Sequence, residues 1–174
     1  SAIWSTSLVL PGLFLKPAAQ TTHHHLRWGN RKLCCGILHA GYLKEMLELS
    51  FPHVMGYDVS GKVVEVGKDV LNVKVGDEVF ARPNQEDAGS IAEFARIQEN
   101  ELAIKPENLS HIDAASVPLA GLTAWQALVT KGNIKQGDKV LIHAGSGGVG
   151  TLAIQIAKHL GAYVAATSSA ANAE

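Results

Sequence analysis

The chain has 174 residues, of which 47% are hydrophobic and 18% are charged, and its formal net charge is −1. This composition is typical of a globular protein and excludes a low-complexity chain. Because basic residues are not in excess, it gives no electrostatic reason to expect nucleic acid or an anionic membrane surface as a partner.

Residues 1–40 show neither a helical period nor strict alternation, and they are interpreted as an atypical N-terminal segment. Their apolar stretch Ile3–Leu15 is similar to a secretion signal, but no Lys or Arg precedes it and a Pro-Gly pair interrupts it. No run reaches the roughly 20 apolar residues that a membrane span needs. The two cysteines, Cys34 and Cys35, are adjacent, which disfavours a disulfide and indicates a reducing, cytoplasmic compartment.

The pattern becomes regular after residue 40. Tyr42–Ser50 has the spacing of a helix, which the Phe-Pro pair that follows would stop. Gly56–Ala81 consists of β-branched runs separated by glycines, which predicts short strands in a small barrel or sandwich. Ile91–Ile97 and Leu102–Ile104 are predicted to add further strands.

Two short helices are predicted next. The first follows Ser110, which together with Asp113 fits an N-terminal cap, and the second runs through Trp125–Val129.

The last part of the chain has the pattern of a βαβ unit. Strands are predicted at Lys139–His143 and Tyr163–Thr167, both buried, with a helix over Val149–Leu160 between them. The helix has a stripe of large apolar residues with alanines beside it, and Gly161 is expected to end it as the C′ residue. The stripe and its neighbours are Leu152, Ile156, Leu160, Ala153 and Ala157.

A glycine-rich loop, "HAGSGGVG", lies between the first of these strands and the helix. Gly145, Gly147 and Gly150 stand in the order G-x-G-x-x-G, and the flanking strand and helix make this weak pattern informative. Glycines allow a tight turn and a close approach of pyrophosphate to the backbone amides at the positive end of the helix. The loop therefore predicts dinucleotide binding, and a mere connecting turn is the alternative.

The tip of the second predicted strand bears on which dinucleotide binds. An acidic residue there would hold a ribose 2′-hydroxyl, but the chain has Ser168 and Ser169 and no acid before Glu174. This favours NADPH over NADH, although no Arg or Lys is present to pair with the 2′-phosphate. The alternative is that both serines only cap the next helix.

Four stretches in order carry a family resemblance: "FPHVMGYDVSGKVVEVGKDVLNVKVGDEVF", "GSIAEFARI", "AASVPLAGLTAW" and "GDKVLIHAGSGGVGTLAIQIAKHLGA". They resemble the medium-chain dehydrogenase/reductase superfamily, above all its zinc-independent quinone oxidoreductase and enone (alkenal) reductase branch. The resemblance implies an α/β plus β fold, in which a GroES-like β-barrel domain over 41–124 precedes a Rossmann NAD(P)-binding domain that starts at 125–174.

The chain departs from this family in two ways. The first strands of the family are not recognisable in residues 1–40, and the Rossmann domain of the family normally continues well beyond residue 174. The chain is therefore expected to be a fragment that folds poorly alone and exposes apolar surface over 140–167.

The resemblance also implies roles for single residues. Tyr57 would lie near the nicotinamide and shape the pocket or bind the substrate oxygen, while Asp58 would orient it. A packing tyrosine and an aspartate that makes only local backbone contacts are equally consistent with the sequence. Thr123 would lie at the nicotinamide side, and the residues implied to contact the pyrophosphate are Ser146, Gly147, Gly148 and Val149.

No metal is expected. Zinc-using relatives have Gly-His-Glu where this chain has Gly56-Tyr57-Asp58, and a cysteine in the region of Leu119–Thr123, where this chain has none. A rival site would combine three consecutive histidines at 23–25 with the two cysteines at 34–35. Side chains of consecutive residues point in different directions and rarely converge on one ion.

The expected function is NADPH-dependent hydride transfer to a quinone or an α,β-unsaturated carbonyl, without zinc and with a homo-oligomer as the full-length form. A conjugated acceptor spreads the delivered charge to its oxygen, where a hydroxyl or water can supply the proton. The alternatives are a non-catalytic NADPH-binding or structural relative and, less in keeping with the missing ligands, a zinc alcohol dehydrogenase.

Overall fold

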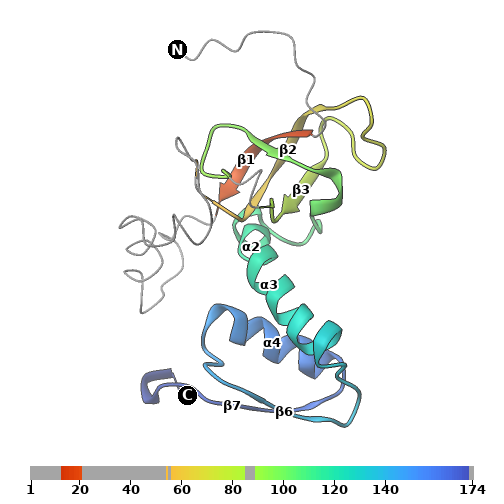
Figure 1. The fold of residues 1–174 in the computed structure, drawn as a ribbon. Helices are drawn as coiled ribbons and strands as arrows, with labels where there is room; N and C mark the ends of the chain where they lie inside the picture. The colour runs from red at the N-terminus through yellow and green to blue at the C-terminus, as the bar shows by residue number, and fades with distance from the viewer. Residues whose placement is uncertain (1–12, 21–53, 55, 85–88, 173–174) are drawn as a thin grey trace, which may run out of the picture. The chain divides into compact units, whose positions relative to one another are not determined.

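The computed structural model describes residues 13–20, 54, 56–84 and 89–172. These residues fall into two compact units, the first ending at Ser116 and the second beginning at Val117 (Figure 1). The helix predicted for Tyr42–Ser50 and the histidine and cysteine cluster lie outside the described residues.

The first unit is built on a five-stranded antiparallel sheet with the strand order β4-β1-β2-β3-β5. This agrees with the predicted GroES-like domain, although the described strands form an open sheet and do not close into a barrel. The strands are β1 (Leu13–Gln20), β2 (Val59–Val66), β3 (Glu78–Ala81), β4 (Ala95–Ile97) and β5 (Leu102–Ile104).

Strand β1 corrects the interpretation of residues 1–40 as a segment without recognisable strands. It lies between β2 and β4, second from one edge of the sheet, and is paired with β2 from Leu13↔Val66 to Gln20↔Val59. The register shifts twice, once between Pro17 and Ala19. A proline cannot donate to the ladder and is accommodated in a sheet at such irregularities, which also break the alternation that would have revealed the strand.

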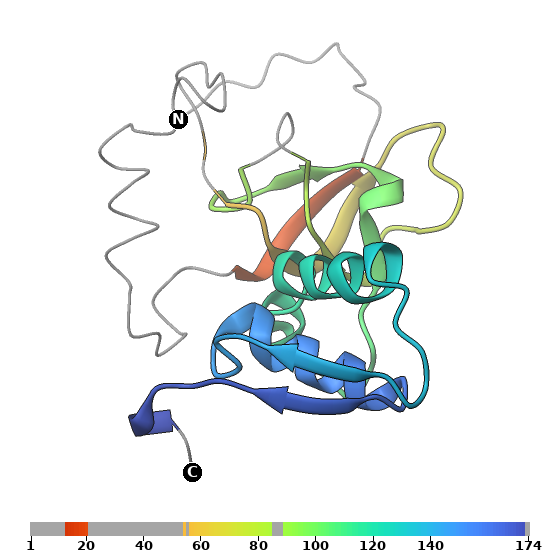
Figure 2. The ribbon, with the colours of Figure 1, turned by 60° about the horizontal axis from the view of Figure 1, so that its bottom comes forward.

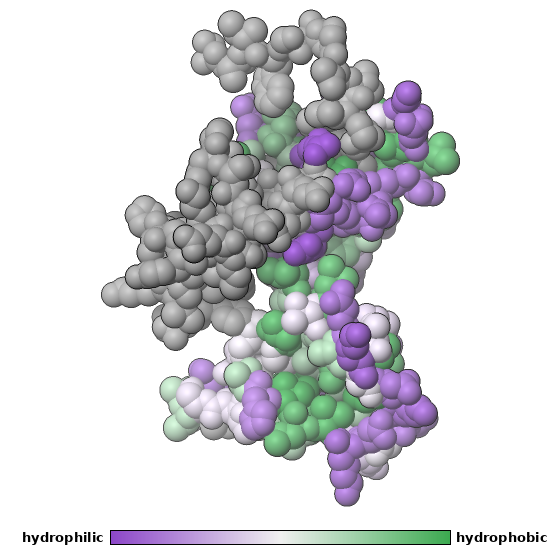
Figure 3. Space-filling model, in the orientation of Figure 1, coloured by the Kyte–Doolittle hydropathy of each residue, from purple (hydrophilic) through white to green (hydrophobic). Residues whose placement is uncertain are grey.

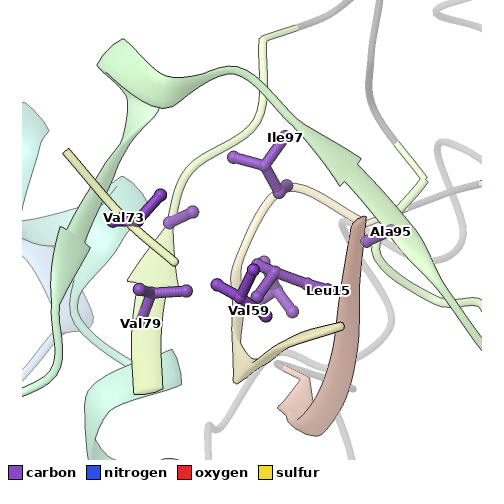
Figure 4. Close-up of a cluster of buried hydrophobic side chains, with 8 residues drawn as sticks. Leu15, Val59, Val73, Val79, Ala95 and Ile97 are labelled. Atoms are coloured by element: carbon purple, nitrogen blue, oxygen red, sulfur yellow. The ribbon is translucent and has the colours of Figure 1, made fainter. Parts of the chain in front are cut away.

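The core of the first unit consists of small β-branched and aliphatic side chains from four strands and a loop (Figure 4). Its buried members are Leu15, Val59, Val63, Val73, Val79, Ala81, Ala95 and Ile97. The helix α2 (His111–Ala115) contacts β1, β2 and β3 and buries two alanines. The hydroxyl of Ser110 accepts the N–H of Asp113 at 3.1 Å, which confirms the predicted cap. The short 3₁₀ helix η1 (Glu99–Glu101) precedes β5.

The second unit contains the predicted βαβ arrangement, with parallel strands paired from Lys139↔Tyr163 to Ile142↔Ala166 (Figure 2). The helix α3 precedes it and continues as a π-helix, η2, so that the predicted helix through Trp125 is part of a longer one. The elements are α3 (Pro118–Trp125), η2 (Gln126–Lys131), β6 (Lys139–Ile142), α4 (Gly148–His159), β7 (Tyr163–Ala166) and η3 (Ala170–Asn172).

The contact between α3 and α4 decides which residues of α4 are buried. Ala153 and Ala157 are buried, whereas Leu152 and Ile156 of the predicted stripe are only partly so. A Cβ at Gly121 of α3 would lie 3.8 Å from Leu152 Cδ1. Small residues let two helices approach closely, and the alanines therefore sit deepest. Gly161, at φ +81°, ends α4 as predicted.

The prediction that both strands of this unit are buried is wrong, because Ile142 of β6 is the one residue of the two strands that is buried. Leu141 of β6 and Tyr163 of β7 are 59% and 70% exposed, because α4 covers only one face of the two strands. This agrees with the expected apolar surface over 140–167, and green patches mark apolar surface on the unit in Figure 3. Within the described part of the chain, no helix combines the length and the apolar character needed to cross a bilayer.

Candidate functional site

The glycine loop connects β6 to the first turn of α4, and two of its glycines are required by packing. A Cβ at Gly145 would lie 2.7 Å from the Cβ of Ala166 and 3.0 Å from Ile154 Cδ1. A Cβ at Gly150 would collide with the carbonyl oxygen of Ala144. The loop, α4 and β7 can meet this closely only because these positions lack side chains.

The start of α4 presents amide groups that the helix itself does not use. Gly147 is the N-cap and offers no side-chain cap, and Thr151 makes the first intrahelical bond, from its N–H to the carbonyl of Gly147 at 2.8 Å. The N–H groups of Gly148, Val149 and Gly150 precede it and have no acceptor within the helix. With the helix dipole they make a binding place for an anion such as a pyrophosphate.

Thr167, directly after β7, holds the glycine loop in place. The sequence analysis did not single out this residue. The carbonyl of Thr167 accepts the N–H of Gly145 at 2.7 Å, and its hydroxyl accepts the N–H of Ala144 at 3.1 Å. The hydroxyl also lies 3.3 Å from Nδ1 of His143. Ala144 itself adopts the left-handed φ of +52°, which is unfavourable for a residue with a Cβ. A polar residue directly after the second strand was the available signal for this contact.

Three predicted cofactor residues come together around a fourth that was missed. The side-chain amide of Asn172 donates to the hydroxyl of Ser169 at 3.1 Å and to that of Ser146 at 3.3 Å. The hydroxyl of Ser168 donates to the carbonyls of Ser169 and Asn172, at 3.3 Å each. Ser168 therefore donates to the backbone of its own turn, whereas the Asn172 amide joins Ser146 and Ser169 across the loop.

Thr123 lies on α3 in the same unit as the glycine loop. Its hydroxyl donates to the carbonyl of Leu119 one turn earlier at 2.7 Å, and its side chain is exposed. The structure thus places Thr123 on the helix that packs against α4, with its proton engaged by its own helix.

Tyr57 belongs to the first unit and lies on a turn that the backbone fixes. Gly56, at φ +112°, accepts the N–H groups of Gly89 at 3.1 Å and Ser90 at 3.3 Å through its carbonyl. The buried hydroxyl of Ser90 donates to the carbonyl of Asp58 at 2.9 Å. The half-buried ring of Tyr57 lies 5.7 Å from the guanidinium carbon of Arg82, within range of a cation–π contact.

A buried polar network in the first unit was not predicted. Ser60, which is fully buried, donates to the carbonyl of Val79 at 3.0 Å and lies 2.7 Å from Nδ1 of His111. Nε2 of His111 lies 3.6 Å from Glu78, whose other carboxylate oxygen is 3.1 Å from the buried ammonium of Lys105. Because Ser60 is closed to solvent, the network fixes α2 on the sheet and does not form a nucleophilic site.

Among the described residues, no three His, Cys, Asp or Glu side chains lie together as ligands of one metal ion would.

Along the chain, an antiparallel sheet of GroES-like type is followed by a βαβ unit with a glycine loop, as at the start of a Rossmann fold. These two parts in this order define the class of protein. The profile of the alcohol dehydrogenase GroES-like domain family matches residues 31–107. The chain belongs to the medium-chain dehydrogenase/reductase superfamily, as the relatives below bear out.

Two curated relatives have names that state their activity. The mitochondrial NAD(P)H oxidoreductase RTN4IP1 of Danio rerio is 46% identical over 123 residues, which cover 68% of this chain and 32% of the relative. The 2-methylene-furan-3-one reductase of Solanum lycopersicum is 44% identical over 131 residues, covering 71% and 34%. This chain therefore spans about a third of the length of these relatives.

Solved structures share the fold. An alcohol dehydrogenase superfamily protein from Novosphingobium aromaticivorans has a TM-score of 0.84 at 32% identity, covering 98% of this chain and 50% of its own. The quinone oxidoreductase from Coxiella burnetii has a TM-score of 0.73 at 41% identity, covering 92% and 48%. A mycobacterial protein complexed with NADPH has a TM-score of 0.71 at 32% identity, covering 92% and 47%.

Proposed function

We propose that this chain is part of an NADPH-dependent oxidoreductase that transfers hydride to a quinone or an α,β-unsaturated carbonyl without zinc. The observation that carries the proposal is the glycine loop at the start of α4. The unbonded amides of Gly148, Val149 and Gly150 suit the pyrophosphate of a dinucleotide, with Ser146 and Gly147 beside them. Relatives named NAD(P)H oxidoreductase, 2-methylene-furan-3-one reductase and quinone oxidoreductase support the same interpretation.

The choice of NADPH rests on the end of β7. Ser169 and Ser146 offer hydroxyls there, the described residues 163–172 include no Asp or Glu, and an acid would repel a 2′-phosphate. The mycobacterial structure with NADPH supports this choice. The nicotinamide of the bound coenzyme supplies the hydride, and the residues of this chain bind and orient the reactants.

Tyr57 is the proposed catalytic residue. Its position on a turn held by Gly56 and Ser90 gives the phenol a fixed origin, and its hydroxyl can donate to a substrate oxygen on which negative charge develops. Thr123 is proposed to line the nicotinamide side. No zinc is required in this mechanism, because a conjugated acceptor delocalises the charge. A cytoplasmic location, a homo-oligomeric assembly and the domain division at 124/125 also stay predictions.

Calorimetric titration with NADPH and NADH tests the proposal, because binding needs only the glycine loop and the end of β7. We expect NADPH to bind more tightly than NADH. A folded protein without affinity for either coenzyme contradicts the proposal. The control is Thr151→Ala: Thr151 follows the three free amides, and its hydroxyl donates to the carbonyl of Gly148 at 3.1 Å without cradling an anion.

Turnover distinguishes the enzyme from the non-catalytic alternative. NADPH oxidation is followed by absorbance in the presence of 1,4-benzoquinone or an alkenal, and a simple ketone serves as the control acceptor. Oxidation with the conjugated acceptors and not with the ketone supports the proposed substrate class. Tight NADPH binding without turnover on any acceptor favours a binding protein.

A further inference from the structure

The side chain of Asn172 links the glycine loop to the segment that follows β7, because it contacts the hydroxyls of both Ser146 and Ser169. Its side-chain amide donates to Ser146 of the loop at 3.3 Å and to Ser169 after β7 at 3.1 Å. Its own N–H donates to the carbonyl of Ser169 at 2.9 Å, which closes the η3 turn. One residue thus ties the two segments from which the candidate 2′-phosphate donors come.

The direction of these bonds has a chemical consequence. A serine hydroxyl has one proton to donate and lone pairs with which to accept. Because Ser146 and Ser169 accept from the Asn172 amide, the proton of each hydroxyl is left to donate elsewhere. Ser168 differs, since its proton goes to the backbone carbonyls of Ser169 and Asn172.

We propose that Asn172 is a positioning residue for coenzyme specificity: by donating to Ser146 and Ser169 it orients their protons toward a group that only accepts. A phosphate dianion is such a group, whereas a ribose 2′-hydroxyl is held best by a carboxylate acceptor. The inference rests on the proposed function. It adds the residue that gives two neutral hydroxyls a preference for the 2′-phosphate, since the described residues 163–172 include no Arg or Lys.

The test uses three variants of the protein. Asn172→Ala removes the donor without adding charge. Asn172→Asp replaces the donor by an acceptor of the same shape, which draws the serine protons to itself. Ala171→Asp adds the same charge at the neighbouring exposed position of η3 and is the control for electrostatic repulsion alone.

The measured quantity is the ratio of the Kd for NADH to the Kd for NADPH, with 2′,5′-ADP against 5′-ADP as a second pair. We expect Asn172→Asp to lower the ratio by about tenfold and Asn172→Ala by a few-fold, as the loss of one or two phosphate hydrogen bonds would. Ala171→Asp is expected to lower it less than Asn172→Asp. The unfolding midpoints should stay close to that of the wild type, because the asparagine is exposed.

Three results would overturn the inference, and they are distinguishable. If the wild type prefers NADPH and both Asn172 variants keep the ratio, Asn172 does not set specificity and the proposed function stands. If affinity for both coenzymes falls equally, Asn172 only shapes the turn. If the folded wild type binds neither coenzyme, the proposed function fails together with the inference.

Discussion

Gly150 lies so close to Ala144 that a Cβ built on it would collide with the Ala144 carbonyl oxygen, so that no side chain fits between the first turn of α4 and the loop that precedes it. The loop is thereby packed against the first turn of α4, and its Gly145 N–H is bonded to the carbonyl of Thr167 directly after β7. Glycine at 150 is therefore needed for packing, and the proposed approach of a pyrophosphate relies on the same lack of a side chain.

Substituting this glycine should damage both the fold of the second unit and its binding. Gly150→Ala forces the loop and α4 apart, and we expect a loss of roughly 1–3 kcal/mol in the free energy of unfolding, as overpacked sites show. Coenzyme affinity should fall with it. Denaturant titration and calorimetry measure the two effects. Gly137→Ala is the control, because a Cβ there meets nothing within 4 Å although the φ of +87° is unfavourable; it should cost stability without changing affinity.

The left-handed conformation of Ala144 predicts a stabilising substitution. An alanine at φ +52° is strained by about 1 kcal/mol, whereas glycine adopts this conformation freely. Ala144→Gly should raise the free energy of unfolding by up to about 1 kcal/mol. Part of this gain is offset because glycine increases the conformational entropy of the unfolded chain. Ala153→Gly, in the buried part of α4, should instead lower it by about 1 kcal/mol or more. A destabilised Ala144→Gly protein would show that this backbone conformation is not adopted in solution.

The contact between Ser60 and His111 should stabilise the packing of α2 on the sheet. Ser60→Ala and His111→Ala each remove the 2.7 Å contact, and we expect a coupling energy of about 1 kcal/mol in a double-mutant cycle. Ser60→Ala should be the more destabilising single change, because it also leaves the carbonyl of Val79 without this donor. Ser116→Ala, at the exposed end of α2, should show no coupling with His111→Ala.

The ion pair of Glu78 predicts how stability responds to acid. The ammonium of Lys105, through a hydrogen bond and its charge, holds the pKa of the Glu78 carboxyl below its ordinary value of 4.5. Because the folded pKa is the lower one, the stabilisation is complete above about pH 4.5 and is lost as the pH falls through the folded pKa. Glu78→Gln should therefore differ from the wild type in unfolding free energy at pH 7 and approach it at pH 3. Lys105→Met should remove the same pH dependence, and a difference that persists unchanged at pH 3 would contradict this assignment.

Tyr57 gives a prediction for activity. Phe in its place keeps the ring near Arg82 and removes only the hydroxyl. If the hydroxyl donates to the substrate oxygen in the transition state, kcat/KM for NADPH oxidation by the quinone should fall by about a hundredfold with an unchanged Kd for NADPH. Arg82→Met tests whether the cation–π contact alone matters. Unchanged turnover in Tyr57→Phe would leave Tyr57 as a packing residue.

The local parts of the fold could be predicted, and the long-range parts could not. The parallel pair of β6 and β7, the helix between them and its end at Gly161 follow from a short-range pattern, and the Ser110 cap needs only four residues. Strand β1 was missed because its irregular register around Pro17 conceals the alternation, and only its partners β2 and β4 reveal it. The GroES-like domain was predicted, but the strand order β4-β1-β2-β3-β5 was not, because it depends on partners far apart in the sequence.

The same distinction holds for the candidate site. Spacing and flanking elements alone determined the glycine loop, because the conformation of a tight turn and the free amides of a helix start are properties of neighbouring residues. Only the tertiary structure decided the partners of the loop, because Thr167 and Asn172 lie more than twenty positions further along the chain than the loop residues they contact. The pairing of β1 with Val59–Val66 likewise spans a long intervening segment. Such contacts depend on how segments distant in the sequence pack together. Hydrophobic periodicity and turn signals are local patterns, and they do not specify which distant residue a given side chain contacts.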